Sequence, residues 1–186
     1  MGRNEDPHHP RLTLRTFRRD DLPLYAALNA DPEVVRYLGG APLSREYSDE
    51  IAAWAQKRFA EEGLGLLAAE RRNDGAFLGM CGLHHLEALP DDVEIAWRLA
   101  REHWCHGYAT EAATASLDHG FGMLRLLRVI SVADRDNERS IAVMRRLGME
   151  FSHETEIEEE GERFEVALYA VTTERWRARV RAAARL

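Results

Sequence analysis

A glycine-containing turn ahead of a long helix is the part of this sequence best suited to bind an anion. The turn is Cys105-His106-Gly107, and the helix after it opens with the small or hydroxylated residues Ala109 and Thr110. The first backbone N–H groups of a helix have no acceptor within the helix, and the helix dipole places positive charge at the same end. Glycine lets a phosphate approach the backbone closely. We therefore predict a phosphate-binding turn, with Thr110 as an additional hydroxyl donor.

A carboxylate and a second polar helix start lie on either side of that turn in the sequence. Glu94 falls within the apolar strand 93–99, and its side chain points to the opposite face from its apolar neighbours. Downstream, Asn137 and Ser140 open a helix that Gly148 ends. Together these elements can form a cradle for a phosphate-bearing cofactor with a reactive end.

Hydrophobic periodicity and turn residues predict the elements that position these groups. The predicted strands are residues 12–17, 66–70, 77–86, 93–99, 128–133, 151–157 and 163–171, and turns fall at 73–75, 89–91 and 160–161. The predicted helices begin at 20–23, run from Asp31 to about Gly39-Gly40, span 44–62, about 108–122 and 140–147, and start again at Thr172 or Thr173.

Composition favours one soluble domain, since 45% of the 186 residues are hydrophobic and 31% are charged. We expect residues 1–10 to be a disordered tail and residues 11–186 a single domain. No apolar run approaches the roughly 20 residues that cross a bilayer, and the polar N-terminus lacks a signal peptide, so a cytoplasmic location without membrane contact is predicted. Two cysteines are too few for a disulfide framework. A net charge of -7 argues against nucleic-acid binding.

These motifs resemble the GNAT superfamily, the acyl-CoA-dependent N-acyltransferases. Within it, the sequence is most similar to the branch of ribosomal-protein N-terminal acetyltransferases. That branch has a Glu-Ile-Gly-Tyr-like strand, then Trp-Gly-x-Gly-Tyr-Ala-Thr-Glu-Ala, Asn-x-x-Ser and Leu-Gly-Phe. The corresponding segments here are Glu94-Ile95-Ala96-Trp97, Trp104 to Ala112, Asn137 to Ser140 and Leu147 to Met149.

Several positions depart from the family pattern. Cys105 stands where a first turn glycine is usual, so we expect a slightly wider loop or reliance on another small side chain. His106 replaces a basic residue, and Met149 replaces an aromatic one. Met144 stands where related enzymes often carry a tyrosine that protonates the leaving thiolate, which methionine cannot do.

The resemblance implies a mixed α/β fold, with a mostly antiparallel sheet of about seven strands, a splayed parallel strand pair and flanking helices. It implies acetyl-CoA as cosubstrate, no metal, and an amine acceptor that is either a protein N-terminus or a small molecule. A homodimer is possible. The implied cofactor contacts are Trp97, Arg98, Leu99, Trp104, Cys105, His106, Gly107, Tyr108, Ala109, Thr110, Asn137, Ser140 and Arg146.

The resemblance also implies direct attack by the amine on the thioester. Glu94 is the expected base, and its alternative role is an ion pair with an arginine beside the sheet. A backbone N–H near Trp97 or Arg98 is expected to stabilise the developing oxyanion. Ser140 is the remaining candidate acid for the thiolate, although it could instead cap its helix, a role that Asn137 could equally fill.

Other patterns suggest alternatives. His84-His85 and His103-x-Cys105-His106 contain metal-binding residue types, but adjacent strand residues point to opposite faces and no closed four-ligand pattern appears. One of the paired histidines could instead line the amine pocket. We expect residues 22–59 to form the specificity lid. Glu154, Glu156 and Glu158 share a strand face that is either solvated or attracts a cation. The functional alternative is a non-catalytic CoA-binding regulatory or scaffold domain.

Overall fold

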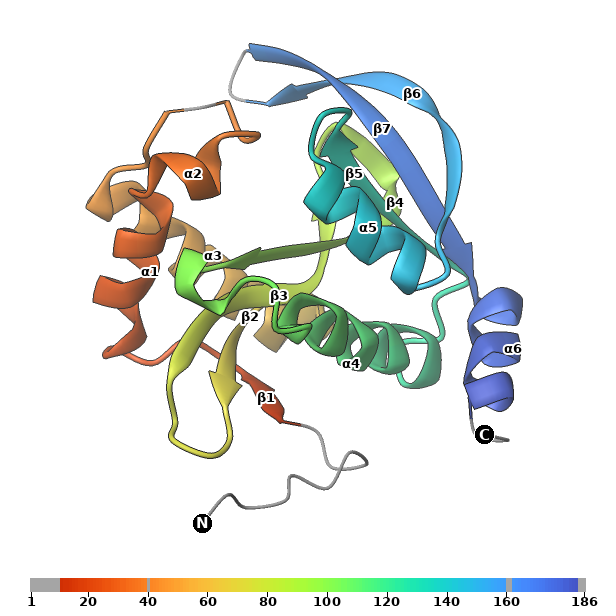
Figure 1. Ribbon diagram of the computed structural model, residues 1–186, viewed down its shortest axis with the longest axis horizontal. Helices are drawn as coiled ribbons and strands as arrows, with labels where there is room; N and C mark the ends of the chain where they lie inside the picture. Colours follow the sequence, from red (N-terminus) through yellow and green to blue (C-terminus); the bar gives the residue numbers. More distant parts are fainter. Residues whose placement is uncertain (1–10, 40, 160–161, 184–186) are drawn as a thin grey trace.

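A seven-stranded mixed sheet forms the centre of the computed structural model, which describes residues 11–39, 41–159 and 162–183 (Figure 1). The strands are β1 (Leu12–Arg15), β2 (Gly65–Arg71), β3 (Phe77–Leu86), β4 (Leu89–Leu99), β5 (Arg128–Asp134), β6 (Glu150–Glu159) and β7 (Glu162–Thr172). Their order in the sheet is β1-β2-β3-β4-β5-β7-β6. Every neighbouring pair is antiparallel except β4 and β5, which run parallel. The predicted fold class is therefore confirmed.

Three helices cover one face of the first four strands: α1 (Asp21–Asn29), α2 (Pro32–Val35) and α3 (Arg45–Glu62). The side chains of Asp31 and Ser44 accept backbone N–H bonds that start α2 and α3, and Gly63 ends α3 in the left-handed region at φ 71°. The apolar cluster beneath these helices consists of Phe17, Tyr25, Leu28, Ala52, Ala55, Leu66, Ala68, Phe77 and Met80.

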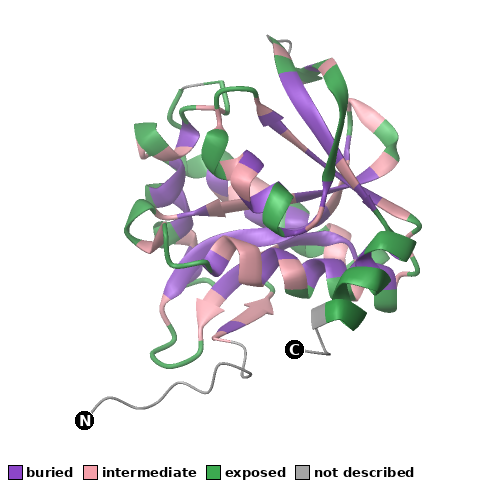
Figure 2. Ribbon diagram, turned by 45° about the vertical axis from the view of Figure 1, so that its right-hand side comes forward, coloured by how far each residue is buried: buried purple, intermediate pink, exposed green. Residues whose placement is uncertain are grey.

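The opposite face packs against α4 (Tyr108–Gly122) and α5 (Glu138–Arg146), with the short 3-10 helix η1 (Arg101–His103) preceding α4. Strand residues alternate between the two faces, so Ala68 belongs to the first cluster and Ala69 to this one. The C-terminal helix α6 (Thr173–Ala183) is mostly exposed (Figure 2). It docks through the buried Trp176, whose indole N–H donates to Asp118 on α4 at 2.8 Å.

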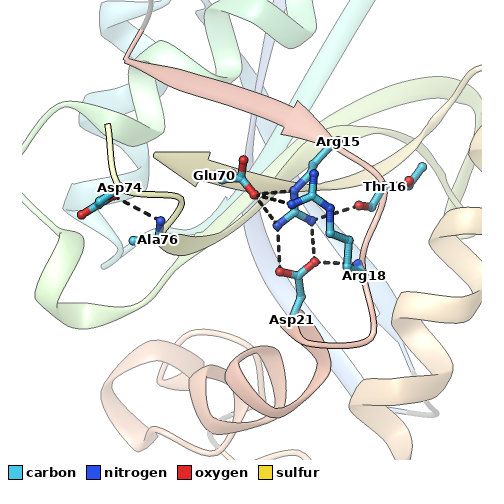
Figure 3. A network of polar contacts seen from close by, with 7 residues as sticks. All are labelled: Arg15, Thr16, Arg18, Asp21, Glu70, Asp74 and Ala76. Carbon is cyan, nitrogen blue, oxygen red and sulfur yellow. Dashed lines mark hydrogen bonds and ion pairs between the residues drawn. The ribbon is translucent and has the colours of Figure 1, made fainter. Parts of the chain in front are cut away.

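A buried polar network joins β1, β2 and α1 (Figure 3). The guanidinium of Arg15 donates to both carboxylate oxygens of Asp21 and to Glu70. Asp21 also accepts the backbone N–H of Arg18 at 2.6 Å. Burial alone would raise the pKa of Asp21, but the bonds from Arg15 and Arg18 outweigh it and hold the pKa below its usual range.

Some predicted boundaries were wrong. The turn expected at 89–91 lies at Glu87 and Ala88, because β4 already begins at Leu89, and Pro90 is tolerated near the start of that strand. The first strand ends at Arg15, and α2 ends at Val35 rather than at the glycines. The expected tail 1–10 and the expected turn at 160–161 lie outside the described residues.

Candidate active site

The sheet opens between its two parallel strands. β4 and β5 share a single register position, Glu94 opposite Ile130, although β4 continues to Leu99. A cavity of about 1910 Å³ lies at this opening. Its walls come from α2 and α3 on one face of the sheet and from α4 and α5 on the other, so it passes through the sheet.

The open edge of β4 presents backbone groups to this cavity. The N–H of Ala100 donates to Leu78 of β3 at 2.9 Å, so by strand alternation the N–H and C=O of Trp97 and Leu99 face away from β3, toward β5. The carbonyl of Leu99 is occupied, because it accepts the indole N–H of Trp104 at 2.8 Å. Of the two amides that the sequence left open for an oxyanion, the one at Trp97 therefore faces the opening.

The N–H of Arg98 points to β3 by the same alternation, and its side chain lies on the α1–α3 face. Its guanidinium donates to Asn29 at 2.6 Å, and Asn29 in turn donates to Ser48 on α3 at 3.1 Å. Asn29 and Ser48 are fully buried. The side chain of Arg98 therefore ties β4 to the α1–α3 side of the cavity, and the role of Arg98 as a cofactor contact stays a prediction.

The turn before α4 has two residues in the left-handed region. Cys105 has φ 62° and Gly107 has φ 80°. The positive φ of Cys105 explains why glycine suits that position, since any side chain in the left-handed region costs about 1 kcal/mol of conformational free energy. Gly107 caps α4 without a side-chain hydrogen bond. Within the described part of the chain, the N–H groups from residue 107 to residue 110 have no acceptor, so they can bind an anion.

Arginines from other elements surround this turn. Arg11 bonds to the carbonyl of His106 at 3.2 Å and to Glu111 at 2.8 Å, and its guanidinium lies over the ring of Tyr108. Arg139 on α5 lies 4.6 Å from the ring centre of Trp104. Two arginines thus lie near the turn, which has no basic residue at position 106, and the charge of Arg11 is balanced by Glu111.

His106 itself does not line the cavity. The left-handed residues on either side turn it outward, where its ring stacks on Tyr108 and its Nδ1 lies 2.7 Å from the carbonyl of Trp104. His103 does line the cavity, and burial lowers its pKa. The remaining implied cofactor positions all line the cavity: Trp97, Arg98, Leu99, Trp104, Cys105, Gly107, Tyr108, Ala109, Thr110, Asn137, Ser140 and Arg146.

The start of α5 resolves two roles that the sequence left open. The side chain of Asn137 accepts the backbone N–H of Ser140 at 3.1 Å, so Asn137 caps the helix. The hydroxyl of Ser140 has no hydrogen-bond partner among the described residues and lines the cavity. Met144 is 1% exposed in the core and is not a lining residue.

Glu94 sits where the two parallel strands part, and 6% of its surface is exposed. Its Oε1 accepts the N–H of Val132 on β5 at 3.1 Å, a donor that a continued parallel ladder would give to a β4 carbonyl. Its Oε2 lies 3.2 Å from Nε2 of His84, its cross-strand neighbour on β3. The partner of Glu94 is therefore a histidine, and no arginine of the described residues pairs with it as the sequence alternative required.

The α3 side of the cavity combines aromatic and acidic residues. Tyr47, Glu50, Ile51 and Trp54 recur at helical spacing and line the cavity as one stripe. Trp54 packs edge-on against His84, with ring centres 6.1 Å apart. Tyr47 and Trp54 are 37% and 40% exposed, although most large apolar side chains are buried. Such a wall suits a cation with an apolar body.

Residues 11–150 match a family model described as an acetyltransferase (GNAT) domain. The chain belongs to this family. The match spans most of the sequence and includes the opening between β4 and β5, the turn before α4 and the start of α5. GNAT proteins transfer an acetyl group from acetyl-CoA to an amine, so this chain has the fold of an N-acetyltransferase.

Two bacterial proteins are similar to this chain over about three quarters of its length. The uncharacterized protein YkkB of Bacillus subtilis is 36% identical over 144 residues, covering 76% of this chain and 83% of that protein. Spermidine N(1)-acetyltransferase of Escherichia coli K12 is 29% identical over 150 residues, covering 77% and 74%.

Solved acetyltransferase structures share the fold. An acetyltransferase from Agrobacterium tumefaciens superposes with a TM-score of 0.76 at 26% identity, covering 91% of this chain and 99% of that one. Spermidine N-acetyltransferase from Vibrio cholerae, solved in complex with CoA and spermine, gives a TM-score of 0.72 at 19% identity, covering 90% and 99%.

Neither a metal-binding cluster nor a membrane-spanning helix occurs in residues 11–39, 41–159 and 162–183. No group of three or more His, Cys, Asp or Glu side chains there could hold a metal ion. No helix in those ranges combines the length and the apolar content needed to span a bilayer.

The contact that sequence analysis missed is the one between His84 and Glu94. The paired histidines were considered as pocket residues, but which of them faces Glu94 depends on the register of the β3–β4 hairpin. A bulge between His85 and Leu86 shifts that register, and no local pattern predicts the bulge.

Proposed function

We propose that this protein transfers the acetyl group of acetyl-CoA to the primary amine of a cationic acceptor. One observation carries the proposal: a single opening in the sheet has an anion-binding turn on one face and a histidine-paired carboxylate with an aromatic, acidic wall on the other. Two substrates that enter from opposite faces would meet at the free edge of β4.

The cofactor side fits a thioester with a diphosphate. The amides at Gly107 to Thr110 bind the phosphates, Arg139 adds positive charge, and Arg11, paired with Glu111, holds the carbonyl of His106. Trp104 holds the carbonyl of Leu99, and Trp97 offers a free backbone edge to the extended arm of the cosubstrate. Acetyl-CoA supplies the activated acyl group when bound. The N–H of Trp97 stabilises the charge that develops on the carbonyl oxygen.

The acceptor must first lose a proton, because an ammonium has no lone pair. At pH 7 this costs about 1.2 kcal/mol for an α-amine and about 4.6 kcal/mol for a lysine-like amine. Glu94 takes this proton. The amine nitrogen then bonds to the acyl carbon as the carbon–sulfur bond breaks, and Ser140 donates its hydroxyl proton to the thiolate and regains one from water.

The acceptor side favours a small cationic amine, of which a polyamine is the leading example. Glu33, Glu50 and Glu158 line the cavity together with Tyr47 and Trp54, and carboxylates with aromatic faces stabilise ammonium groups. A protein N-terminus, the substrate of the branch that the motifs resemble, is the second acceptor, since its α-amine is the easier one to deprotonate. The single domain, a cytoplasmic location and a homodimer remain predictions.

An acceptor screen tests the proposal. Purified protein is incubated with acetyl-CoA and with spermidine, spermine, monoamines or N-terminal peptides, and thiol release is measured together with the mass of the acetylated product. We expect polyamines to give the highest kcat/KM. Thiol release without an acetylated product would indicate only hydrolysis of acetyl-CoA. Tight acetyl-CoA binding with no turnover of any acceptor would instead favour the non-catalytic CoA-binding alternative.

Ser140→Ala tests the acid. Because Asn137 caps α5, the substitution removes only the proton donor, and we expect kcat to fall about tenfold with little change in the melting temperature. Asn137→Ala is the matched control. It should cost about 1 kcal/mol of stability through loss of the cap.

A further inference from the structure

His84 has oxygen atoms at both ring nitrogens. Its Nδ1 lies 3.1 Å from the carbonyl oxygen of His85, and its Nε2 lies 3.2 Å from Oε2 of Glu94. Its side chain is 15% exposed, against 7% for that of Glu94, and both residues line the cavity. Trp54 packs edge-on against the ring and limits its rotation.

The proton count of this pair follows from the two contacts. A backbone carbonyl only accepts, so Nδ1 must carry the hydrogen that it shares with His85. One further proton between Nε2 and Oε2 then makes the second hydrogen bond, whichever of the two atoms holds it. Without that proton, a nitrogen lone pair faces a carboxylate oxygen at 3.2 Å, which is repulsive. The unprotonated pair therefore gains a hydrogen bond when it takes up one proton.

We propose that His84 is the positioning residue of the acetyl-transfer site: it fixes Oε2 of Glu94 and makes the two side chains act as one proton acceptor. This inference rests on the proposed function, in which Glu94 receives the proton of the acceptor amine. In the step itself, an N–H bond of the ammonium breaks, and its proton enters the Oε2–Nε2 hydrogen bond. The nitrogen keeps the electron pair with which it attacks, and the pair later returns the proton to water.

The two carboxylate oxygens of Glu94 have different partners and therefore different roles. Oε1 is held by the N–H of Val132, so Glu94 remains fixed at the point where β4 and β5 part, whatever happens at Oε2. Only the Oε2 side changes its protonation during the reaction. The carboxylate therefore need not reorganise when the proton arrives, which favours rapid transfer.

Other charged groups face the same cavity and act on the pair from a distance. Their positions are spread over the elements around the cavity: Glu33 on α2, Arg36 directly after α2, Glu50 on α3, Glu87 in the turn after β3, Arg98 on β4 and Glu158 on β6. His85 is the titratable neighbour on β3. The carboxylates favour an added proton and the arginines oppose it, and solvent screens both effects. Because the variants below keep all of these groups, a change in pH dependence reports on position 84.

The central test compares the pH dependence of kcat/KM for the wild type and for His84→Gln, with one acceptor and saturating acetyl-CoA throughout. Glutamine can still donate a hydrogen bond to Oε2 but does not titrate. We expect the acid limb of the profile to move to lower pH by about one unit or more, because glutamate and histidine side chains ordinarily differ by about two units. We also expect kcat to fall about tenfold at pH 7, since a lone carboxylate is the weaker base.

His153→Gln is the matched control. This histidine is exposed on β6, outside the cavity, and contacts the hydroxyl of Ser152. Its profile should coincide with that of the wild type. A purely structural role for His84 would lower the melting temperature or raise KM in His84→Gln but leave the acid limb in place, and that result would overturn the inference.

Two further measurements keep the test decisive. If His84→Gln folds poorly, the ¹⁵N imidazole signals of the wild type are titrated instead. We expect one histidine to change protonation at the pH of the acid limb, and to do so at a different pH in Glu94→Gln. If the proposed function is wrong, Glu94→Gln will keep full activity. If Glu94→Gln is inactive but the acid limb of the pH profile stays in place in His84→Gln, only the role of His84 is refuted.

Discussion

Asp21 and Glu94 are both buried carboxylates, with 4% and 6% of their surfaces exposed, but their hydrogen-bond donors differ. Asp21 is held by both ends of the Arg15 guanidinium and by a backbone N–H (Figure 3). Glu94 has one backbone N–H and one histidine, and it lines a cavity. An arginine keeps its proton at every relevant pH, whereas a histidine exchanges one. The hydrogen-bond donors thus distinguish a carboxylate that joins structural elements, Asp21, from one that can take part in proton transfer, Glu94.

The largest expected effect comes from Glu94→Gln. We expect kcat to fall by about 10²–10⁴, the usual contribution of a general base, and the loss to ease as pH rises, because more acceptor is then already deprotonated. Steady-state kinetics between pH 6 and pH 10 would measure this, with acetyl-CoA affinity measured by calorimetry. A variant with unchanged kcat at pH 7 would show that Glu94, like Asp21, only joins elements.

Asp21→Asn makes the same chemical change at the other carboxylate. It places an amide against the guanidinium of Arg15, and disruption of a buried ion pair costs about 3 kcal/mol of unfolding free energy. Because Asp21 does not line the cavity, kcat per folded molecule should stay within about twofold. Urea unfolding measures the loss of stability, and active-site titration with steady-state kinetics measures kcat per folded molecule. Loss of kcat without loss of stability would contradict it.

The fold and the position of the helix starts at the cavity could be predicted from the sequence because their signals are local. Gly107, the residues after it, and Asn137 with Ser140 are short motifs at helix starts, and each lines the cavity. Their contacts with acetyl-CoA stay a prediction. The helix caps at Asp31 and Ser44 are local in the same sense.

The acceptor side could not be predicted to the same depth, because its contacts depend on register. A turn at 89–91 would set Glu94 opposite the wrong residue of β3, and the bulge after His85 shifts the pairing again. The bonds between Arg11 and Glu111 join residues 100 positions apart, so no local pattern contains them. Cys105 is an intermediate case: its departure from glycine was evident, but its φ of 62° was not.

His84→Arg gives Glu94 the kind of partner that Asp21 has. A permanent cation at Oε2 lowers the affinity of the carboxylate for a proton. We expect kcat at pH 7 to fall about 30-fold, or roughly 2 kcal/mol, while the unfolding free energy stays the same or rises. His153→Arg adds the same charge on exposed β6 and should leave kcat unchanged. Full activity in His84→Arg would mean that the identity of the partner does not matter.

The smallest effect concerns the pH dependence of stability. The Arg15 and Arg18 bonds place the pKa of Asp21 below its ordinary value in the folded chain, so the unfolded chain binds more protons in acid. The stability that Asp21 contributes is complete above its ordinary value of about 3.9 and is lost as pH falls through the lowered pKa. The difference in unfolding free energy between the wild type and Asp21→Asn should therefore shrink below about pH 4, by at most about 1.4 kcal/mol per pH unit.

Urea unfolding of both proteins at several pH values between 3 and 7 measures this difference, and a constant difference across that range would contradict it. Activity measured over the same pH range distinguishes the two carboxylates, because each affects its own property at a different pH. If His84 and Glu94 share a proton as proposed, activity declines at a pH where the Asp21 network is still fully ionised and the protein is still folded. On acidification, activity would then be lost at a higher pH than folding stability, because a histidine exchanges protons in a pH range where an arginine-bound aspartate does not.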